Sequence, residues 1–346
     1  MGKYKLINNV LGWIVFAIAS TVYLMTMEPT ASFWDCGEFI SSAYKLEVGH
    51  PPGAPFFMLT ANLFTQLASD PSTVAKMVNT MSALFSGLTI LFLFWSITHL
   101  ARKIMVKDGE EASLGQMITV MGSGLVGALA YTFSDTFWFS AVEGEVYAYS
   151  SLFTAVVFWL ILKWEAVADK PHADRWIVLI AYLMGLSIGV HLLNLLCIPA
   201  IVLVYYYKKF PNPTMKGTLV ALLASFAIVA LMMYGVVQGL VEVCGYFELL
   251  FVNVLGMPYN SGVFAYVIIV AGVLIWSIWE TMRDEIHPTR MKIAFILSVV
   301  LIGIPFIGSG YVLAVILTAA LSLYLFKSKK VDIKTLNTIL VCLMVV

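Results

Sequence analysis

The sequence predicts an all-α polytopic integral membrane protein, and three observations carry that prediction. Of the 346 residues, 61% are hydrophobic and only 12% are charged, whereas a soluble domain has about a quarter charged and about half apolar residues. The mean hydropathy is +0.92. Apolar runs close to the length of a membrane-spanning helix recur along the chain. Because 20 Lys and Arg balance 20 Asp and Glu, the composition argues against a nucleic-acid partner.

The first predicted helix covers residues 7–27 and follows an N-terminus that carries Lys3 and Lys5. Its length matches a membrane span and no small-x-small cleavage site follows it, so we expect a retained span rather than a signal peptide. Ten further runs give about eleven expected spans, at 74–100, 114–133, 146–164, 176–190, 192–207, 218–237, 263–278, 293–307, 311–326 and 333–346. The last run has no polar flank, so the chain is expected to be C-terminally truncated.

Residues 55–68 are expected to form a helix that lies along the membrane interface. The run has about 14 residues, too few for a span, and it contains Thr60, Asn62, Thr65 and Gln66. An amphipathic helix of this length suits the interface better than the bilayer core. Counting the run as a span also places the Lys and Arg residues that follow residue 100 on the wrong side of the membrane.

With that choice, 18 of the 20 Lys and Arg residues fall on the inner side, together with the N-terminus. The expected outer segments are 28–73, 134–145, 189–193 and 238–262, and the expected inner segments include 102–113, 165–175 and 208–217. Lys45 and Lys76 remain outside. Ten acids also fall on the outer side: Glu28, Asp35, Glu38, Glu47, Asp70, Asp135, Glu143, Glu145, Glu242 and Glu248. The outer surface is therefore expected to be strongly anionic.

The first outer segment contains two motifs, FWDCGEF at 33–39 and GHPPGAP at 49–55. A short helix is expected over 39–48, ended by Gly49 and the two prolines after His50. Asp35 and Glu38 are three residues apart, so both carboxylates can share one helix face. One interpretation is a capping box. The other is a functional acidic pair, because ionisable groups among aromatic side chains at the interface usually have a role.

The next two outer segments carry further polar residues that can act on a ligand. Glu143 and Glu145 are expected to open the helix at 146–164, where the helix dipole favours acids. Trp138, Phe139 and Tyr147 stand beside them. These aromatic residues fit either an interfacial belt or a surface that stacks on sugar rings. The turn GVHLLNL at 189–195 adds His191 and Asn194, and a lone histidine such as His191 or His50 is more often structural than functional.

At WDCGEF, GHPPGAP, EGEVYA and GVHLLNL the sequence resembles the DUF2723 family of bacterial multi-pass membrane proteins. That family is related to protein O-mannosyltransferases and to the GT-C glycosyltransferases. The similarity runs from about Trp13 to Tyr207 and more loosely through IPFIGSGY at 304–311. It implies a single GT-C-like transmembrane domain over 1–346 with interfacial helices in the first outer loop, followed in family members by a soluble domain. The family's acidic motif falls on Asp35 and Glu38.

The resemblance implies transfer of a mannose-like sugar from a polyprenyl-phosphate donor to an acceptor hydroxyl on protein Ser/Thr or on a glycan. The reaction would take place at the periplasmic face of a bacterial inner membrane. A phosphate leaves without being protonated, so one general base suffices, in contrast to the paired carboxyls of glycosidases. Asp35 and Glu38 are the expected catalytic residues. The expected substrate-binding residues are Trp34, His50, Glu143, Glu145, Tyr147, His191 and Asn194.

An anionic donor phosphate on an acidic surface needs positive charge. Either a divalent cation bridges carboxylates and phosphate, or a C-terminal region supplies Arg or Lys, which we favour. No cofactor is therefore assigned. Two other functions stay open, a secondary transporter and a non-catalytic membrane scaffold. A transporter is expected to carry charged residues near the bilayer midplane and broken helices in paired halves, whereas here the acids lie at the outer ends of the predicted spans.

Overall fold

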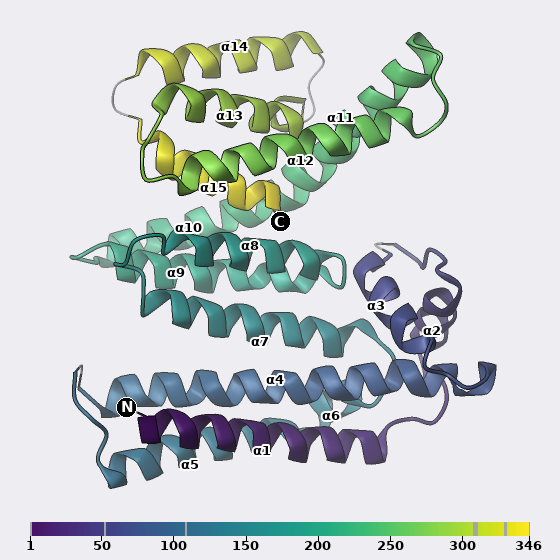
Figure 1. Ribbon diagram of the computed structural model, residues 1–346, viewed down its shortest axis with the longest axis vertical. Helices are drawn as coiled ribbons and strands as arrows, with labels where there is room; N and C mark the ends of the chain where they lie inside the picture. The colour runs from purple at the N-terminus through teal and green to yellow at the C-terminus, as the bar shows by residue number, and fades with distance from the viewer. Residues whose placement is uncertain (1, 52, 108, 307–310, 329–330, 346) are drawn as a thin grey trace. The chain divides into compact units, whose positions relative to one another are not determined.

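The structure is a computed structural model that describes residues 2–51, 53–107, 109–306, 311–328 and 331–345. Every regular element in these ranges is a helix (Figure 1). Seven of the described helices are long and apolar enough to cross a membrane: Gly2–Thr26, Pro71–Met105, Leu114–Thr132, Val146–Glu165, Leu192–Lys209, Met215–Val254 and Ser261–Met282. The helical, multi-pass membrane class is therefore supported, but the expected total of about eleven spans is not confirmed.

The difference in span number comes from four apolar runs that form helices shorter than a span. These are α8 (Asp174–Ile188), α13 (Pro288–Leu301), α14 (Tyr311–Lys327) and α15 (Ile333–Val345), with 13 to 17 residues each. About 20 residues are needed to cross the hydrocarbon core. Residues 307–310 of the IPFIGSGY motif, Pro52 of GHPPGAP and residue 346 lie outside the described residues.

The segment 238–262 is helical for most of its length, and its expected position on the outer side of the membrane stays a prediction. α10 (Met215–Leu231) continues through a π-helical turn at Met232–Val236 into α11 (Val237–Leu249) and a second such turn at Leu250–Val254. No proline occurs between residue 214 and Pro258. Without that helix breaker, the apolar run propagates as one helix, and only the short connection before α12 (Ser261–Met282) is irregular.

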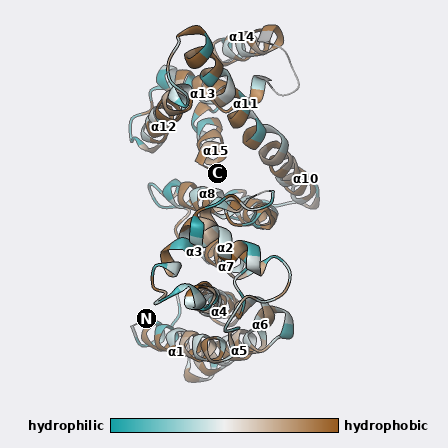
Figure 2. Ribbon diagram, turned by 90° about the vertical axis from the view of Figure 1, so that its right-hand side faces the viewer, coloured by the Kyte–Doolittle hydropathy of each residue, from teal (hydrophilic) through white to brown (hydrophobic). Residues whose placement is uncertain are grey.

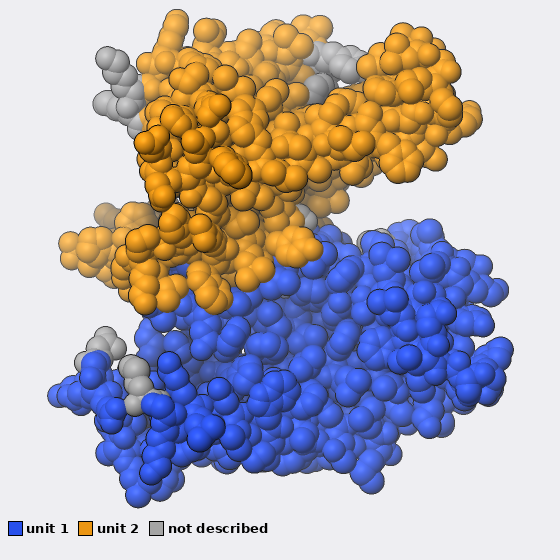
Figure 3. All heavy atoms as spheres, in the orientation of Figure 1, with its two compact units in different colours: residues 1–166, 183–197 blue, residues 167–182, 198–346 orange. Residues whose placement is uncertain are grey.

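The described residues divide into two compact units, coloured separately in Figure 3. Unit 1 comprises residues 1–166 and 183–197, and unit 2 comprises residues 167–182 and 198–346. Unit 1 contains all nine residues that the sequence indicated as catalytic or substrate-binding. In unit 2, α12 contacts α11 and α13, and α13 also contacts α15. The expectation of one transmembrane domain stays a prediction.

Unit 1 is built around α4 (Val74–Met105), which contacts α1 (Gly2–Thr26), α5 (Leu114–Thr132) and α7 (Val146–Glu165). Figure 1 shows α4 between α1 and α7. Small residues allow these helices to pack closely against one another, as in other membrane helix bundles. A Cβ at Gly124 of α5 would lie 2.7 Å from the Phe94 ring of α4. In Figure 2 the hydrophobic colour predominates along the spans, as expected for helices that face lipid.

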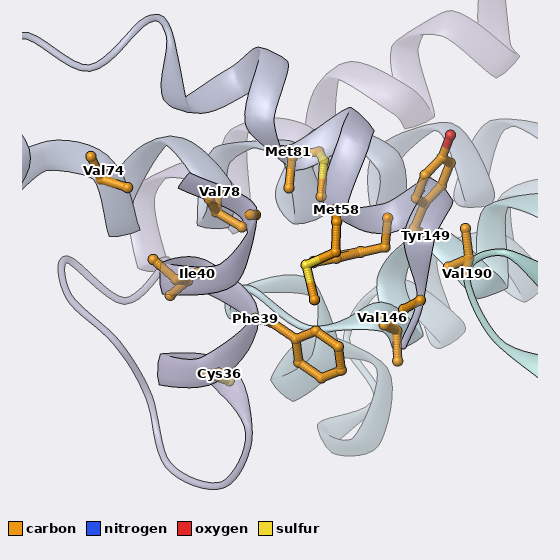
Figure 4. Packing of buried hydrophobic residues seen from close by; sticks show 14 of the residues in the cluster. Cys36, Phe39, Ile40, Met58, Val74, Val78, Met81, Val146, Tyr149 and Val190 are labelled. Atoms are coloured by element: carbon orange, nitrogen blue, oxygen red, sulfur yellow. The ribbon is translucent and has the colours of Figure 1, made fainter. Parts of the chain in front are cut away.

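Two short helices pack against one end of α4 and α7, and they form the framework of the first outer segment. α2 spans Cys36–Lys45 and α3 spans Pro55–Thr65. Phe39 and Ile40 of α2 and Met58 of α3 belong to one buried cluster with Val78 and Met81 of α4 (Figure 4). This cluster holds the FWDCGEF and GHPPGAP motifs in place. A short helix within 55–68 was expected, and α3 confirms it.

The bounds of α2 differ from the sequence expectation of a helix over 39–48. The helix begins three residues earlier and ends at Lys45, before Gly49 and the prolines. Leu46 adopts a left-handed conformation with φ 54°. Its N–H donates to the Ala43 carbonyl and the N–H of Glu47 donates to the Ser42 carbonyl. These bonds form the C-terminal cap that ends a helix without proline.

Candidate active site

Asp35 stands directly before α2, on a backbone turn that exposes its neighbour Trp34. Trp34 has φ 59°, a left-handed conformation that is uncommon for a bulky residue, and its side chain is 88% exposed. Asp35 occupies the N-cap position of α2, but its side chain makes no capping hydrogen bond. The capping-box interpretation is therefore wrong. The exposed Asp35 carboxylate is available to a ligand.

Glu38 connects the two motifs of the first outer segment. Its Oε1 accepts a hydrogen bond from the backbone N–H of His50 at 2.5 Å, and its Oε2 lies 3.1 Å from His50 Nδ1. The hydrogen bond from the His50 backbone, followed by the one from its ring, lowers the pKa of the Glu38 carboxyl. Glu38 and His50 thus hold each other and fix the shape of this segment.

Asp35, Glu38 and His50 also form a group of metal-ligand type. Their ligand atoms all lie within 4.8 Å of one another. Two carboxylates and an imidazole are a donor set that suits Mn²⁺ or Zn²⁺. A bound cation would have to replace the existing Glu38–His50 hydrogen bond, so the group fits a divalent cation in donor chemistry but is already partly satisfied without one.

The second outer segment brings Glu143 and Glu145 against the first. A short helix, α6 (Asp135–Ala141), precedes them, and Glu145 is the N-cap of α7. Asn79 of α4 donates hydrogen bonds to the carbonyls of Glu28 at 2.6 Å and Thr30 at 3.0 Å. A Cβ at Gly144 would lie 2.9 Å from Asn79 Oδ1. Only glycine therefore fits between the two glutamates without moving Asn79.

Both glutamates are buried, with 3% of Glu143 and 6% of Glu145 exposed. The side chains of Ser32 and Cys36 hydrogen-bond to Glu143. Burial is the main cause that raises the pKa of Glu143. Burial, and then the negative charges of Glu143 and Asp35, raise the pKa of Glu145 to about 7. The second outer segment is therefore a place where a carboxylic acid can keep its proton near neutral pH.

These side chains surround an outer cavity of about 610 Å³. Its lining residues come from three segments: Trp34, Asp35, Asp135, Thr136, Phe139, Ser140, Glu143, Glu145 and Tyr147. Five of the residues indicated by the sequence meet here, although more than 100 residues of chain separate Asp35 from Glu143. Among the described residues, none that lines the cavity is Lys, Arg or His. The outer cavity thus combines four carboxyl groups with aromatic surface.

His191 and Asn194 do not line the outer cavity. The His191 ring lies 5.4 Å from the Tyr147 ring, centroid to centroid, and burial lowers the pKa of its imidazole. Asn194 is buried and accepts a hydrogen bond from Thr154 Oγ1 at 2.6 Å. The outer cavity therefore brings Glu143 together with Asp35 but does not include His191, whose ring contacts Tyr147 of the lining.

A second cavity, the apolar groove, has a volume of about 700 Å³ and is lined from α4, α5, α7 and the 3₁₀ turn Leu192–Cys197. Its lining residues are Thr89, Leu93, Ser96, Ile97, Leu100, Gly127, Tyr131, Tyr147, Ser150, Ser151, Thr154, Ala155, Phe158, Leu193 and Asn194. Tyr147 belongs to both linings. The groove and the outer cavity therefore adjoin at this tyrosine.

Sequence reasoning named Asp135 and Phe139 but missed the helix α6, which also brings Thr136 and Ser140 to the outer cavity. Its signal is present in SDTFWFSA: Ser134 precedes the helix and Asp135 occupies its first turn, as is typical of a helix start. The helix has only seven residues, so hydrophobic periodicity cannot reveal it. Its role depends on where it packs.

The profile of the family described as "Protein O-mannosyl-transferase TMEM260 N-terminal domain" matches residues 35–214. Protein O-mannosyl-transferase TMEM260 of Mus musculus is 28% identical over 174 residues, which are 50% of this chain and 22% of the relative. Protein O-mannosyl-transferase tmem260 of Dictyostelium discoideum is 25% identical over 187 residues, 52% of this chain and 21% of the relative. The chain thus spans about a fifth of the length of these relatives.

No solved structure matches the chain. The comparisons support the resemblance to O-mannosyltransferases and do not confirm the DUF2723 family or a bacterial source. The family match begins at Asp35 and covers the residues that line the outer cavity, except Trp34. It covers slightly more than half of the chain. The chain therefore belongs to the family of the protein O-mannosyl-transferase TMEM260 N-terminal domain.

Proposed function

We propose that the chain is the membrane part of a GT-C-type glycosyltransferase that moves a mannose-like sugar from a polyprenyl-phosphate donor to a protein Ser/Thr hydroxyl. The observation that carries the proposal is the Asp35 carboxylate, exposed at the outer cavity and free of any capping hydrogen bond. The names of the two relatives, both protein O-mannosyl-transferases, support the class of reaction.

Asp35 is the general base of the proposed reaction. The acceptor oxygen attacks the anomeric carbon, the bond from that carbon to the phosphate oxygen breaks, and the phosphate leaves with the electron pair. The acceptor proton passes to Asp35. A single displacement of this kind inverts the anomeric configuration. Trp34 and Phe139 line the same cavity, and their aromatic faces suit stacking on the sugar ring.

The apolar groove supports a lipid-linked donor rather than a water-soluble one. The groove residues of α4 run from Thr89 to Leu100, which is roughly 16 Å at the α-helical rise of 1.5 Å per residue. An isoprenoid tail in the groove would bring the donor phosphate to Tyr147, where the outer cavity begins. The donor can then enter from the bilayer, and no soluble cleft is needed.

The proposal places the reaction on the membrane side opposite the Lys and Arg residues, at the periplasmic face of a bacterial inner membrane. At the other end of α4, Arg102 lies over the Tyr4 ring and Lys103 pairs with Glu165 at 2.5 Å. The N-terminus and the ends of α4 and α7 thus gather basic side chains at one end of unit 1. The positive-inside rule assigns that end to the cytoplasm.

A transfer assay tests the proposed function. The full-length protein is incubated with labelled polyprenyl-phosphate mannose and a Ser/Thr-rich peptide, using donors of long and short isoprenoid chain. Ala155→Phe fills the groove and should raise KM for the long-chain donor about tenfold or more, while the short-chain donor is affected less. Ala17→Phe makes the same change at an exposed position of α1. It should leave both donors unaffected.

Two results would count against the proposal. No transfer from any donor by the purified full-length protein would overturn the assigned reaction. Equal effects of Ala155→Phe on long and short donors would remove the groove from donor binding and leave the reaction standing.

A further inference from the structure

Glu145 is a buried residue whose side chain lines the outer cavity. It is 6% exposed, and no described residue donates a hydrogen bond to its side chain. Glu145 occupies the N-cap position of α7, but its side chain makes no capping hydrogen bond. Its backbone N–H donates to the Glu143 carbonyl at 3.0 Å. Glu143, by contrast, is hydrogen-bonded by Ser32 and Cys36. The Glu145 carboxyl is therefore left facing the cavity that it lines.

The groups around Glu145 oppose its ionisation. Glu143 precedes it by two residues, Asp35 faces it from the start of α2, and Asp135 of α6 lines the same cavity. His50 is a neighbour that favours the charged form, and it is already hydrogen-bonded to Glu38. Tyr147 is the remaining titratable side chain of the lining. Neighbouring carboxyls in a buried site cannot all ionise at little cost, and the least satisfied one keeps its proton.

We propose that Glu145 carries its proton when the donor is bound and donates a hydrogen bond from its carboxyl O–H to a phosphate oxygen of the donor. The inference rests on the proposed function. It explains how an acidic cavity whose described lining residues include no Lys, Arg or His accepts an anion. Burial and the neighbouring acids raise the pKa of Glu145 to about 7, which agrees with the geometry. Asp35 is exposed and keeps the role of general base. The different surroundings of the two acids thus give Asp35 the role of base and Glu145 the role of hydrogen-bond donor.

Glu145 transfers no proton in this role. Its O–H remains intact while Asp35 takes the acceptor proton, so the proton count of the reaction is unchanged. The rival explanation for phosphate binding is a divalent cation held by Asp35, Glu38 and His50. The two explanations differ in their response to pH and to chelation, and both responses can be measured on donor binding alone.

Infrared difference spectroscopy of the full-length protein in detergent tests the protonation directly. Below about pH 6, the carbonyl stretch of a protonated carboxyl should be present in the parent and absent in Glu145→Gln. Above about pH 8 the band should disappear from the parent. These limits lie one pH unit to each side of the pKa of about 7. Glu47→Gln, an exposed acid beyond α2, is the control and should remove no such band. A fully ionised Glu145 below about pH 6 would overturn the proposal.

Binding of polyprenyl-phosphate mannose, without acceptor and in the presence of EDTA, tests the hydrogen bond. This phosphodiester keeps a single charge over the pH range used. The parent should lose about tenfold in affinity between about pH 6 and pH 8, since only the protonated fraction donates. Glu145→Gln, whose amide N–H replaces the O–H, should bind with little pH dependence, and Glu145→Ala should bind at least about tenfold more weakly than the parent near pH 6.

Equal pH dependence in the parent and Glu145→Gln would overturn the proposal. Loss of binding in EDTA, restored by Mn²⁺, would also overturn it in favour of the cation. Failure of the proposed function has a different signature, because no variant would then bind the donor at any pH while the infrared band remained.

Discussion

The substitution Asp35→Asn tests the catalytic role of Asp35 separately from any role in folding. The amide keeps the size of the carboxylate but does not accept a proton, and general-base catalysis is worth about 10²–10⁴-fold. At about 1.36 kcal/mol per factor of ten, the barrier to transfer should rise by about 2.7–5.4 kcal/mol. The side chain is exposed and makes no capping hydrogen bond. The free energy of unfolding should therefore change by less than about 0.5 kcal/mol.

Asp70→Asn is the matched control, because it makes the same substitution at an exposed acid that does cap a helix. Asp70 Oδ1 accepts hydrogen bonds from the backbone N–H of Ser72 at 2.8 Å and from its hydroxyl at 2.5 Å. Asn caps a helix about as well as Asp, so Asp70→Asn should change stability little and leave transfer unchanged. The two variants should therefore differ in transfer and not in stability.

The assay measures transfer from labelled polyprenyl-phosphate mannose to a Ser/Thr peptide at matched amounts of folded protein, and thermal unfolding is followed on the same samples. Donor binding by Asp35→Asn should stay close to that of the parent. A transfer rate within about threefold of the parent would refute the assignment of Asp35 as base. A large loss of stability would instead show that Asp35 has a structural role.

Three further outcomes are expected. Glu38→Gln should lower the transfer rate about tenfold or less, because Glu38 bonds to the His50 backbone rather than to a reacting atom. Steady-state kinetics measure this rate. A loss equal to that of Asp35→Asn would contradict the expectation. The pKa of Glu145 is raised to about 7 in the folded protein, so protonation of Glu145 stabilises the folded state. The free energy of unfolding of the parent, relative to that of Glu145→Gln, should therefore fall as pH rises from about 5 to about 8. Thermal unfolding across that range measures the difference, and a difference independent of pH would show that Glu145 titrates normally. In a variant without native cysteines, a cysteine introduced at Glu110 should resist an impermeant maleimide in intact cells while one at Trp34 reacts; labelling of the former from outside would invert the topology.

The class of the protein and the position of its acidic motifs are properties that the sequence determines alone. Hydropathy and the absence of helix breakers act locally, so each apolar run expected to be a span is helical over most of its described length. Asp35, Glu143 and Glu145 were recognisable because acids beside aromatic residues at the ends of apolar runs are costly without a partner or a role. The short helix α3 followed from length and composition in the same way.

Only the tertiary structure decided what each of these acids does. Glu38 bonds to His50 instead of capping α2, α6 completes the outer cavity, and Tyr147 lines both the cavity and the groove. Glu143 has hydrogen-bond donors and Glu145, two residues away, has none among the described residues. Local sequence cannot distinguish these two glutamates, because burial, hydrogen bonding and the field of nearby charges are set by segments that meet only when α2, α4, α6 and α7 pack together.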